Sequence, residues 1–159
     1  VMMAGSPGRG LPPINDISTD LIQPPTFRAA LHEPANEGRD MSYPDEFVPL
    51  VREAYPDIAP IWLEDEKSQA YRRARDAALA LGWEISFEDE AGGTFEAQQV
   101  SSIFRFVDDI VVRVSERKEG TVIDLRSKSR DGRGDLGVNA ERIRAFAGRI
   151  EPTAPVASE

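Results

Sequence analysis

Proline is concentrated at the start of this sequence, where ten of the twelve prolines fall within residues 1–60. Each proline removes a backbone donor and disfavours helical geometry at the residue before it. The pattern predicts an extended arm over residues 1–60, with at most one short helix at 45–53. The prolines of this arm are Pro7, Pro12, Pro13, Pro24, Pro25, Pro34, Pro44, Pro49, Pro56 and Pro60.

Large apolar side chains are spread along the same arm. An extended segment cannot bury enough apolar surface by itself to offset the entropy that it loses on ordering. We therefore expect the arm to lie along a partner protein. The predicted partner-binding side chains are Ile14, Ile17, Leu21, Ile22 and Phe27.

In the rest of the chain, the spacing of apolar residues changes from one typical of a helix to one typical of strands and back again. Apolar residues at helical spacing predict a helix over 65–81, with Asp65 as N-cap and Gly82 just beyond its end. Alternating apolar residues then predict strands at 83–88, 94–103, 106–115 and 121–129. A last helix over 139–150 follows, and we expect Asn139 to cap it.

This order predicts an α+β fold. We expect an antiparallel four-stranded sheet with two helices packed on one face and solvent on the other, preceded by the extended proline-rich arm. The predicted divisions are the arm (1–60), the α+β domain (61–151) and a tail (152–159).

Composition narrows the functional classes. With 159 residues, 40% of them hydrophobic and 30% charged, the sequence is typical of one globular domain. The net charge of −9 argues against nucleic acid as a partner. There is no cysteine and only one histidine, His32, so we predict no metal site, and no run of about 18 apolar residues spans a bilayer.

Gly132, Gly134 and Gly137 have the G-x-G-x-x-G spacing of a dinucleotide fingerprint. That motif needs a parallel βαβ unit and an acidic residue about 20 residues further on, at the end of the next strand. No such strand follows in this sequence. We therefore expect no dinucleotide and no other cofactor, and interpret the glycines as turn residues.

The segment DLRSKSRDGRGDLGVNAERIRAF, which begins at Asp124, is similar to a signature of the bacterial family called domain of unknown function 1499, R-S-x-S-R-x-G-x-x-D-x-G-x-N-x-x-R-I. LPPINDISTDLIQPP, YPDIAPIWL, ALGWEI and FRFVDDIVVRV also resemble blocks of that family, in its order. Family members are often anchored by N-terminal apolar segments, so the resemblance implies a bacterial membrane protein, with the periplasmic face expected and residues 1–4 as the stub of an anchor.

The signature has two alternative interpretations. The first is a structural latch in which Asn139 caps the helix, Asp135 neutralises a signature arginine and the serines bind the loop backbone. The second is an anion site made by the arginines and the helix N-terminus. The polar residues concerned are Arg126, Ser127, Ser129, Arg130, Asp135, Asn139 and Arg142.

Asp108 and Asp109 are adjacent on a predicted strand, so their carboxylates point to opposite faces and cannot share a metal. We expect one of them to pair with a signature arginine.

Three functions stay open. The first is a non-enzymatic accessory domain that docks on a membrane-embedded protein complex. The second is a cup for an apolar ligand or lipid, and the third is a hydrolase using Asp135 and Ser127 or Ser129 with Arg130. The aromatic residues predicted to line the cup are Trp83, Phe87, Phe95 and Phe104.

Overall fold

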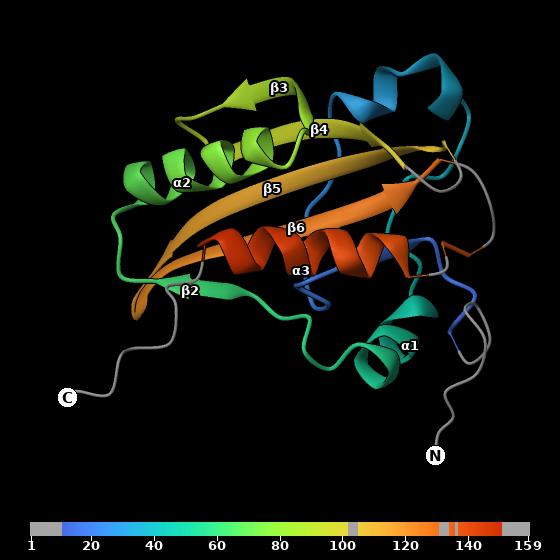
Figure 1. The fold of residues 1–159 in the computed structure, drawn as a ribbon, viewed down its shortest axis with the longest axis horizontal. Coiled ribbons are helices and arrows are strands. Elements are labelled where there is room, and N and C mark those ends of the chain that lie inside the picture. The colour runs from blue at the N-terminus through green and yellow to red at the C-terminus, as the bar shows by residue number, and fades with distance from the viewer. Residues whose placement is uncertain (1–10, 102–104, 131–133, 136, 151–159) are drawn as a thin grey trace.

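The computed structural model describes residues 11–101, 105–130, 134–135 and 137–150. Its centre is an antiparallel sheet of six strands (Figure 1). The order across the sheet is β1-β6-β5-β4-β3, and β2 pairs with the same edge of β6 as β1, nearer the start of that strand. The strands are β1 (Asp16–Ser18), β2 (Ile61–Leu63), β3 (Glu84–Asp89), β4 (Thr94–Val100), β5 (Val107–Arg117) and β6 (Gly120–Ser129).

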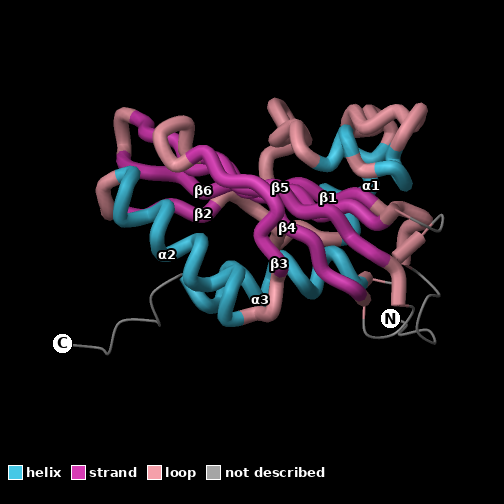
Figure 2. Tube along the Cα trace, turned by 90° about the horizontal axis from the view of Figure 1, so that it is seen from above, coloured by secondary structure: helices cyan, strands magenta, loops and turns pink. Residues whose placement is uncertain are grey.

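Two helices, α2 (Lys67–Ala80) and α3 (Val138–Ile150), cover one face of this sheet (Figure 2). A shorter helix, α1 (Phe47–Ala54), precedes β2. The main core lies between the helices and the alternate residues of β5 and β6 that face them. Trp83 stacks on Phe146 of α3 there, with ring centroids 5.2 Å apart.

Helix α2 begins with a capping box. The Glu66 side chain accepts a hydrogen bond from the backbone N–H of Gln69, and the Gln69 side-chain oxygen accepts one from the backbone N–H of Glu66 at 3.0 Å. The prediction that Asp65 caps this helix is therefore wrong by one residue. Gly82 follows the C-cap Leu81 with φ +83°, as predicted for a residue that ends a helix.

The predicted α+β class and antiparallel sheet are confirmed, but four strands is too few. The two additional strands, β1 and β2, are three residues long and pair with β6. An unpaired sheet edge exposes backbone donors and acceptors, and these short strands satisfy part of that edge on β6. The described part of residues 1–60 thus shares the core of the α+β domain, instead of forming a separate arm.

The apolar residues of the predicted arm are mostly internal, so their assignment as partner-binding side chains needs correction. Ile14 and Ile17 are fully buried in the main core, and Leu21 is half-buried against it. Phe27 packs in a second cluster with Met41 and Val111. Only Ile22 is exposed, at 84%. Most of these side chains are therefore buried within the chain itself and are not available to a partner.

Residues 19–45, called here the N-terminal layer, cross the sheet face opposite α2 and α3 (Figure 2). They contain two short 3₁₀ turns, Ala30–His32 and Pro34–Asn36. The expectation that this face is solvated is therefore wrong. The face is rich in charged residues, and the layer supplies backbone and side-chain groups that form hydrogen bonds with them.

Two glycines offer a stability test. Gly82 and Gly93 both have positive φ (+83° and +79°), but an added Cβ meets nothing at Gly82, whereas at Gly93 it falls onto the carbonyl oxygen of Val114. We expect Gly82→Ala to lower the free energy of unfolding by about 1 kcal/mol and Gly93→Ala by about 2–3 kcal/mol. Urea denaturation measures both, and equal losses would contradict the packing argument.

Candidate functional site

The polar latch, as the structure forms it, lies under the N-terminal end of α3 and consists of Ser127, Ser129, Asp135, Asn139 and Arg142. Asn139 is fully buried at its centre. Its amide nitrogen donates to Asp135 Oδ2 at 2.7 Å and to Ser129 Oγ at 2.9 Å. Its amide oxygen accepts from Ser127 Oγ at 2.5 Å and from Arg142 Nη1 at 2.9 Å. Five of the seven residues predicted for the latch come together here, and the other two, Arg126 and Arg130, lie elsewhere.

Asp135, not Asn139, caps α3. Its carboxylate accepts the backbone N–H of Gly137 at 2.9 Å and that of Asn139 at 3.1 Å. A carboxylate in this position is favoured by the helix dipole and satisfies donors that have no partner inside the helix. Its hydrogen bonds go to the helix start and to the Asn139 amide, so the expectation that it neutralises a signature arginine is not met.

The arginine of the latch is neutralised by Asp108. Arg142 Nη1 lies 2.7 Å from Asp108 Oδ2, and both side chains are almost fully buried. Burial raises the pKa of the Asp108 carboxyl, although the Arg142 charge opposes this effect. Arg142 Nε also donates to Gln99 Oε1 at 2.7 Å, which ties α3 to β4.

Arg126 lies on the opposite face of the sheet, under the N-terminal layer. Its guanidinium pairs with Asp16 through two bonds, Nε to Oδ1 at 2.9 Å and Nη2 to Oδ2 at 2.7 Å. It also donates to the carbonyl oxygens of Pro25 and Met41. Because the rings of Phe27 and Tyr43 lie 4.7 and 5.3 Å from its guanidinium carbon, this one side chain fastens β1 and both ends of the N-terminal layer.

Two further carboxylates fasten the layer. Asp109 accepts two bonds from Arg130, both at 2.9 Å, and one from Asn36. The expectation that one of Asp108 and Asp109 pairs with a signature arginine holds for both of them, on opposite faces. Glu96 accepts the backbone N–H groups that open the first 3₁₀ turn, those of Arg28, Ala29 and Ala30, at 2.7 to 3.0 Å.

The signature is thus divided by strand alternation. Ser127 and Ser129 of β6 face α3, whereas Arg126 faces the N-terminal layer and Arg130, just past the end of β6, pairs on that same side. The anion site predicted from all the signature arginines does not form, because Arg142 lies on the other side of the sheet from Arg126 and Arg130 and each arginine is paired with a carboxylate. The polar groups of the signature serve as two internal fastenings.

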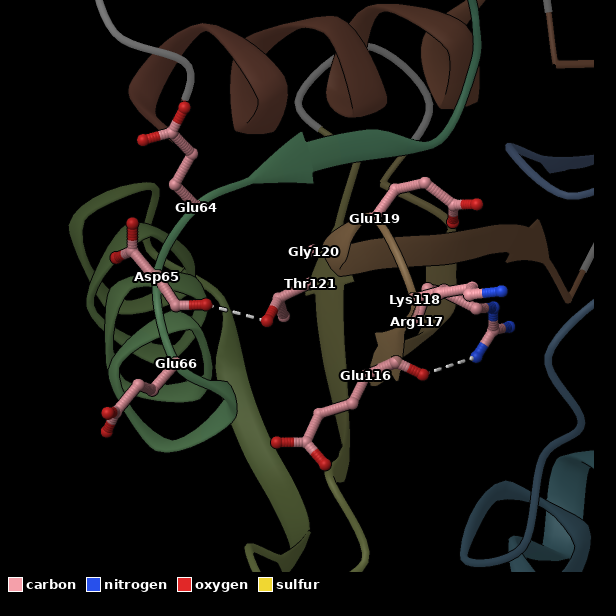
Figure 3. A pocket seen from close by; sticks show the side chains of 9 residues that line it. All are labelled: Glu64, Asp65, Glu66, Glu116, Arg117, Lys118, Glu119, Gly120 and Thr121. Carbon is pink, nitrogen blue, oxygen red and sulfur yellow. Dashed lines mark hydrogen bonds between the residues drawn. The ribbon is translucent and has the colours of Figure 1, made fainter.

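A surface hollow of about 620 Å³ lies between the turn that precedes α2 and the β5–β6 hairpin (Figure 3). Figure 3 shows the carboxylates of Glu64, Glu66 and Glu116 pointing away from one another. Across the described residues, no group of three or more histidine or acidic side chains is placed to hold a metal ion. The hydrogen bond from Thr121 Oγ1 to the Asp65 carbonyl at 2.6 Å joins the two segments, whereas the other bond drawn there, from Arg117 to the Glu116 carbonyl, lies within the hairpin.

Comparison with known protein families gives a match that covers both the latch and the residues that hold the N-terminal layer. The model of a family described as "Protein of unknown function (DUF1499)" matches residues 16–150. The chain belongs to the DUF1499 family. The match begins at Asp16, the partner of Arg126, and ends at Ile150, the last residue of α3. A search of curated proteins finds no match.

The aromatic residues predicted to line a cup in this DUF1499 domain do not share one cavity wall. Trp83 stacks on Phe146, and Phe95 meets Tyr71 edge-on at 5.7 Å. Phe87 lies on the other face under the guanidinium of Arg28, and Phe104 is outside the described residues. Ordinary core packing accounts for the internal rings.

The residues of the predicted hydrolase are divided between the two faces of the sheet, with Ser127, Ser129 and Asp135 in the latch and Arg130 on the other side. Ser127 is fully buried with its hydroxyl donated to Asn139, and Ser129 is covered as well. Arg130 pairs with Asp109 on the opposite face.

No helix among the described residues of the DUF1499 chain is long and apolar enough to span a membrane.

Proposed function

We propose that this DUF1499 chain is a non-enzymatic accessory domain that binds another protein of a membrane complex. The binding surface is the side of the molecule that carries the N-terminal layer. The observation that carries the proposal is Trp62, a tryptophan that is 51% exposed in the middle of a strand whose two other residues are buried.

Register places Trp62 beyond the N-terminal layer. It pairs with Val122 of β6 and faces away from α2 and α3, whereas Ile61 and Leu63 face the core. The layer crosses β6 at Asp124, two residues further along, where Thr19 donates to that carboxylate at 2.7 Å. The indole is therefore left uncovered at the end of the sheet, and tryptophan is the side chain most enriched among residues that dominate binding energy.

Ile22 is a second exposed apolar side chain on the layer side, because the turn that carries it is bound to Arg113. Asp20 holds the turn by accepting the backbone N–H of Ile22 at 2.9 Å and of Gln23 at 3.0 Å, and it pairs with Arg113 at 2.8 Å. Burial alone raises the pKa of Asp20, but these donors outweigh it and hold the pKa below its usual value. A fixed turn presents an exposed apolar side chain with little ordering cost on binding.

The membrane location is supported by the family resemblance, whose members are often anchored at their N-termini. An anchored domain is held close to its membrane partner, which raises the effective concentration of the binding surface. A small surface centred on one tryptophan and one isoleucine is then sufficient for association.

Photo-crosslinking tests the proposal. A benzoylphenylalanine is placed at position 62, at position 22, or at position 72, where the exposed Arg72 of α2 lies on the helix side of the sheet. We expect adducts of one discrete mass from positions 62 and 22 in solubilised membranes of the producing cells, and none from position 72. Adducts that are absent, or equal at all three positions, contradict the proposal.

A further inference from the structure

Lys128 occupies an unusual place between the sheet and the N-terminal layer. It lies on β6 on the same face as Arg126, and its direct neighbours across the sheet are Asp16 on β1 and Asp109 on β5. Both carboxylates are already bound by two nitrogens of an arginine, Arg126 for Asp16 and Arg130 for Asp109. The half-buried ammonium therefore stands between two neutralised pairs.

Among the described residues, Lys128 forms no hydrogen bond and no ion pair of its own. Arg39 of the N-terminal layer is the second cation here, and its guanidinium donates to the carbonyl oxygen of Arg130. Arg39 has no ion pair within the described part of the chain, and the Asp40 carboxylate, whose Oδ1 accepts from the Ser42 hydroxyl at 2.6 Å, attracts Lys128 without forming an ion pair with it. Two cations without a carboxylate of their own are thus gathered in a chain whose net charge is −9.

The electrostatics of the site agree with this geometry. Burial lowers the pKa of the Lys128 amine, and the charges of Arg126 and Arg39 lower it further, while Asp16 and Asp109 act in the opposite direction. These surroundings destabilise the protonated form of the Lys128 amine. An anion close to both cations would offset this destabilisation.

We propose that Lys128 and Arg39 form a binding site for a small oxyanion, either a phosphate group or a carboxylate. Lysine supplies a compact positive charge and arginine a planar pair of donors, which is the combination that tetrahedral and planar oxyanions accept. The bound anion joins β6 to the N-terminal layer and so closes the layer more firmly over the sheet.

Lysine-selective NMR tests the site directly, because the chain has only three lysines, Lys67, Lys118 and Lys128. Protein labelled with ¹³C-lysine is titrated at constant ionic strength with inorganic phosphate in one arm and acetate in the other. We expect the Lys128 Cε signal to shift and saturate in at least one arm, which names the anion class. Lys118, exposed on the β5–β6 hairpin, is the control signal.

Two variants complete the test. Arg39→Gln changes an exposed side chain, and we expect it to weaken the anion affinity at least about fivefold without unfolding the protein. Lys118→Met serves as the matched control, with unchanged affinity. A Lys128 signal that stays still in both arms, that moves in parallel with the other two lysines, or that responds equally in Arg39→Gln overturns the proposal.

Discussion

An Asp16→Asn variant is expected to lose about 3–5 kcal/mol of unfolding free energy at neutral pH. The substitution keeps the size of the side chain but removes the charge that neutralises Arg126, whose side chain is 1% exposed. An unpaired guanidinium at that depth has no water to replace the carboxylate. Urea denaturation at pH 7 measures the loss.

The matched control is Asp57→Asn, which removes the acid from the Arg144–Asp57 pair. That pair has the same two-bond geometry, at 2.6 and 3.0 Å, but its side chains are 37% and 54% exposed. We expect a loss of no more than about 1 kcal/mol there, because solvent screens the pair. Similar losses in the two variants would show that burial does not decide the strength of the Asp16 pair.

The same variant has a local signature. Arg126 also donates to the carbonyls of Pro25 and Met41, so disturbing it loosens the N-terminal layer at two points. Hydrogen exchange is expected to accelerate first at the backbone amides of residues 28–30, which Glu96 holds in the same layer. Uniform acceleration across the sheet and the layer together would contradict this local effect.

The order of helices and strands from α2 onward was predictable because each of these elements is long enough to show a period. β1 and β2 were missed for the opposite reason: three residues such as Ile61, Trp62 and Leu63 cannot show an alternation. Whether an extended segment pairs with an open edge of β6 or lies on another protein depends on that edge, and the edge is a property of the folded sheet. The prediction that these segments are extended was therefore correct, but the prediction that they lie on another protein was not.

Five of the seven residues predicted for the polar latch lie in it, but the partners of Asp135 and the acid bound by each arginine were not predicted. A period of two separates Arg126 from Ser127, so the division of the signature between two faces was available from the strand pattern itself. The acids that bind its arginines were harder to assign. Asp16 lies 110 positions before Arg126, and no local pattern relates residues at that separation. The surface that carries Trp62 was missed together with β2.

An Asn139→Asp variant is expected to lose about 3–5 kcal/mol of unfolding free energy at pH 7, with a characteristic pH dependence. The amide nitrogen that donates to Asp135 Oδ2 at 2.7 Å becomes an oxygen, which places two buried carboxyl groups in contact. The bond to Ser129 loses its nitrogen donor as well. Arg142 still reaches the other oxygen of the side chain, so it offsets only part of the repulsion.

The sign of the pH effect follows from the neighbours of the new carboxyl at position 139. Burial and the Asp135 charge raise its pKa in the folded state above the unfolded value of about 3.9. Below about pH 4 the group is protonated in both states and can donate to Asp135 as the amide did, so the deficit relative to wild type is smallest there. As the pH rises, the unfolded chain loses this proton first, and the deficit grows until the folded protein loses it too.

Urea denaturation of wild type and variant at a series of pH values between 4 and 8 measures the deficit, with Asn139→Leu as the control. Leucine removes the same hydrogen bonds without adding a titratable group, so its deficit is expected not to follow this trend. A deficit in Asn139→Asp that is independent of pH, or that stays below about 1 kcal/mol, would mean that water reaches the latch. The latch would then be an open polar site beneath α3, and the assignment of the signature to internal fastening would have to be withdrawn.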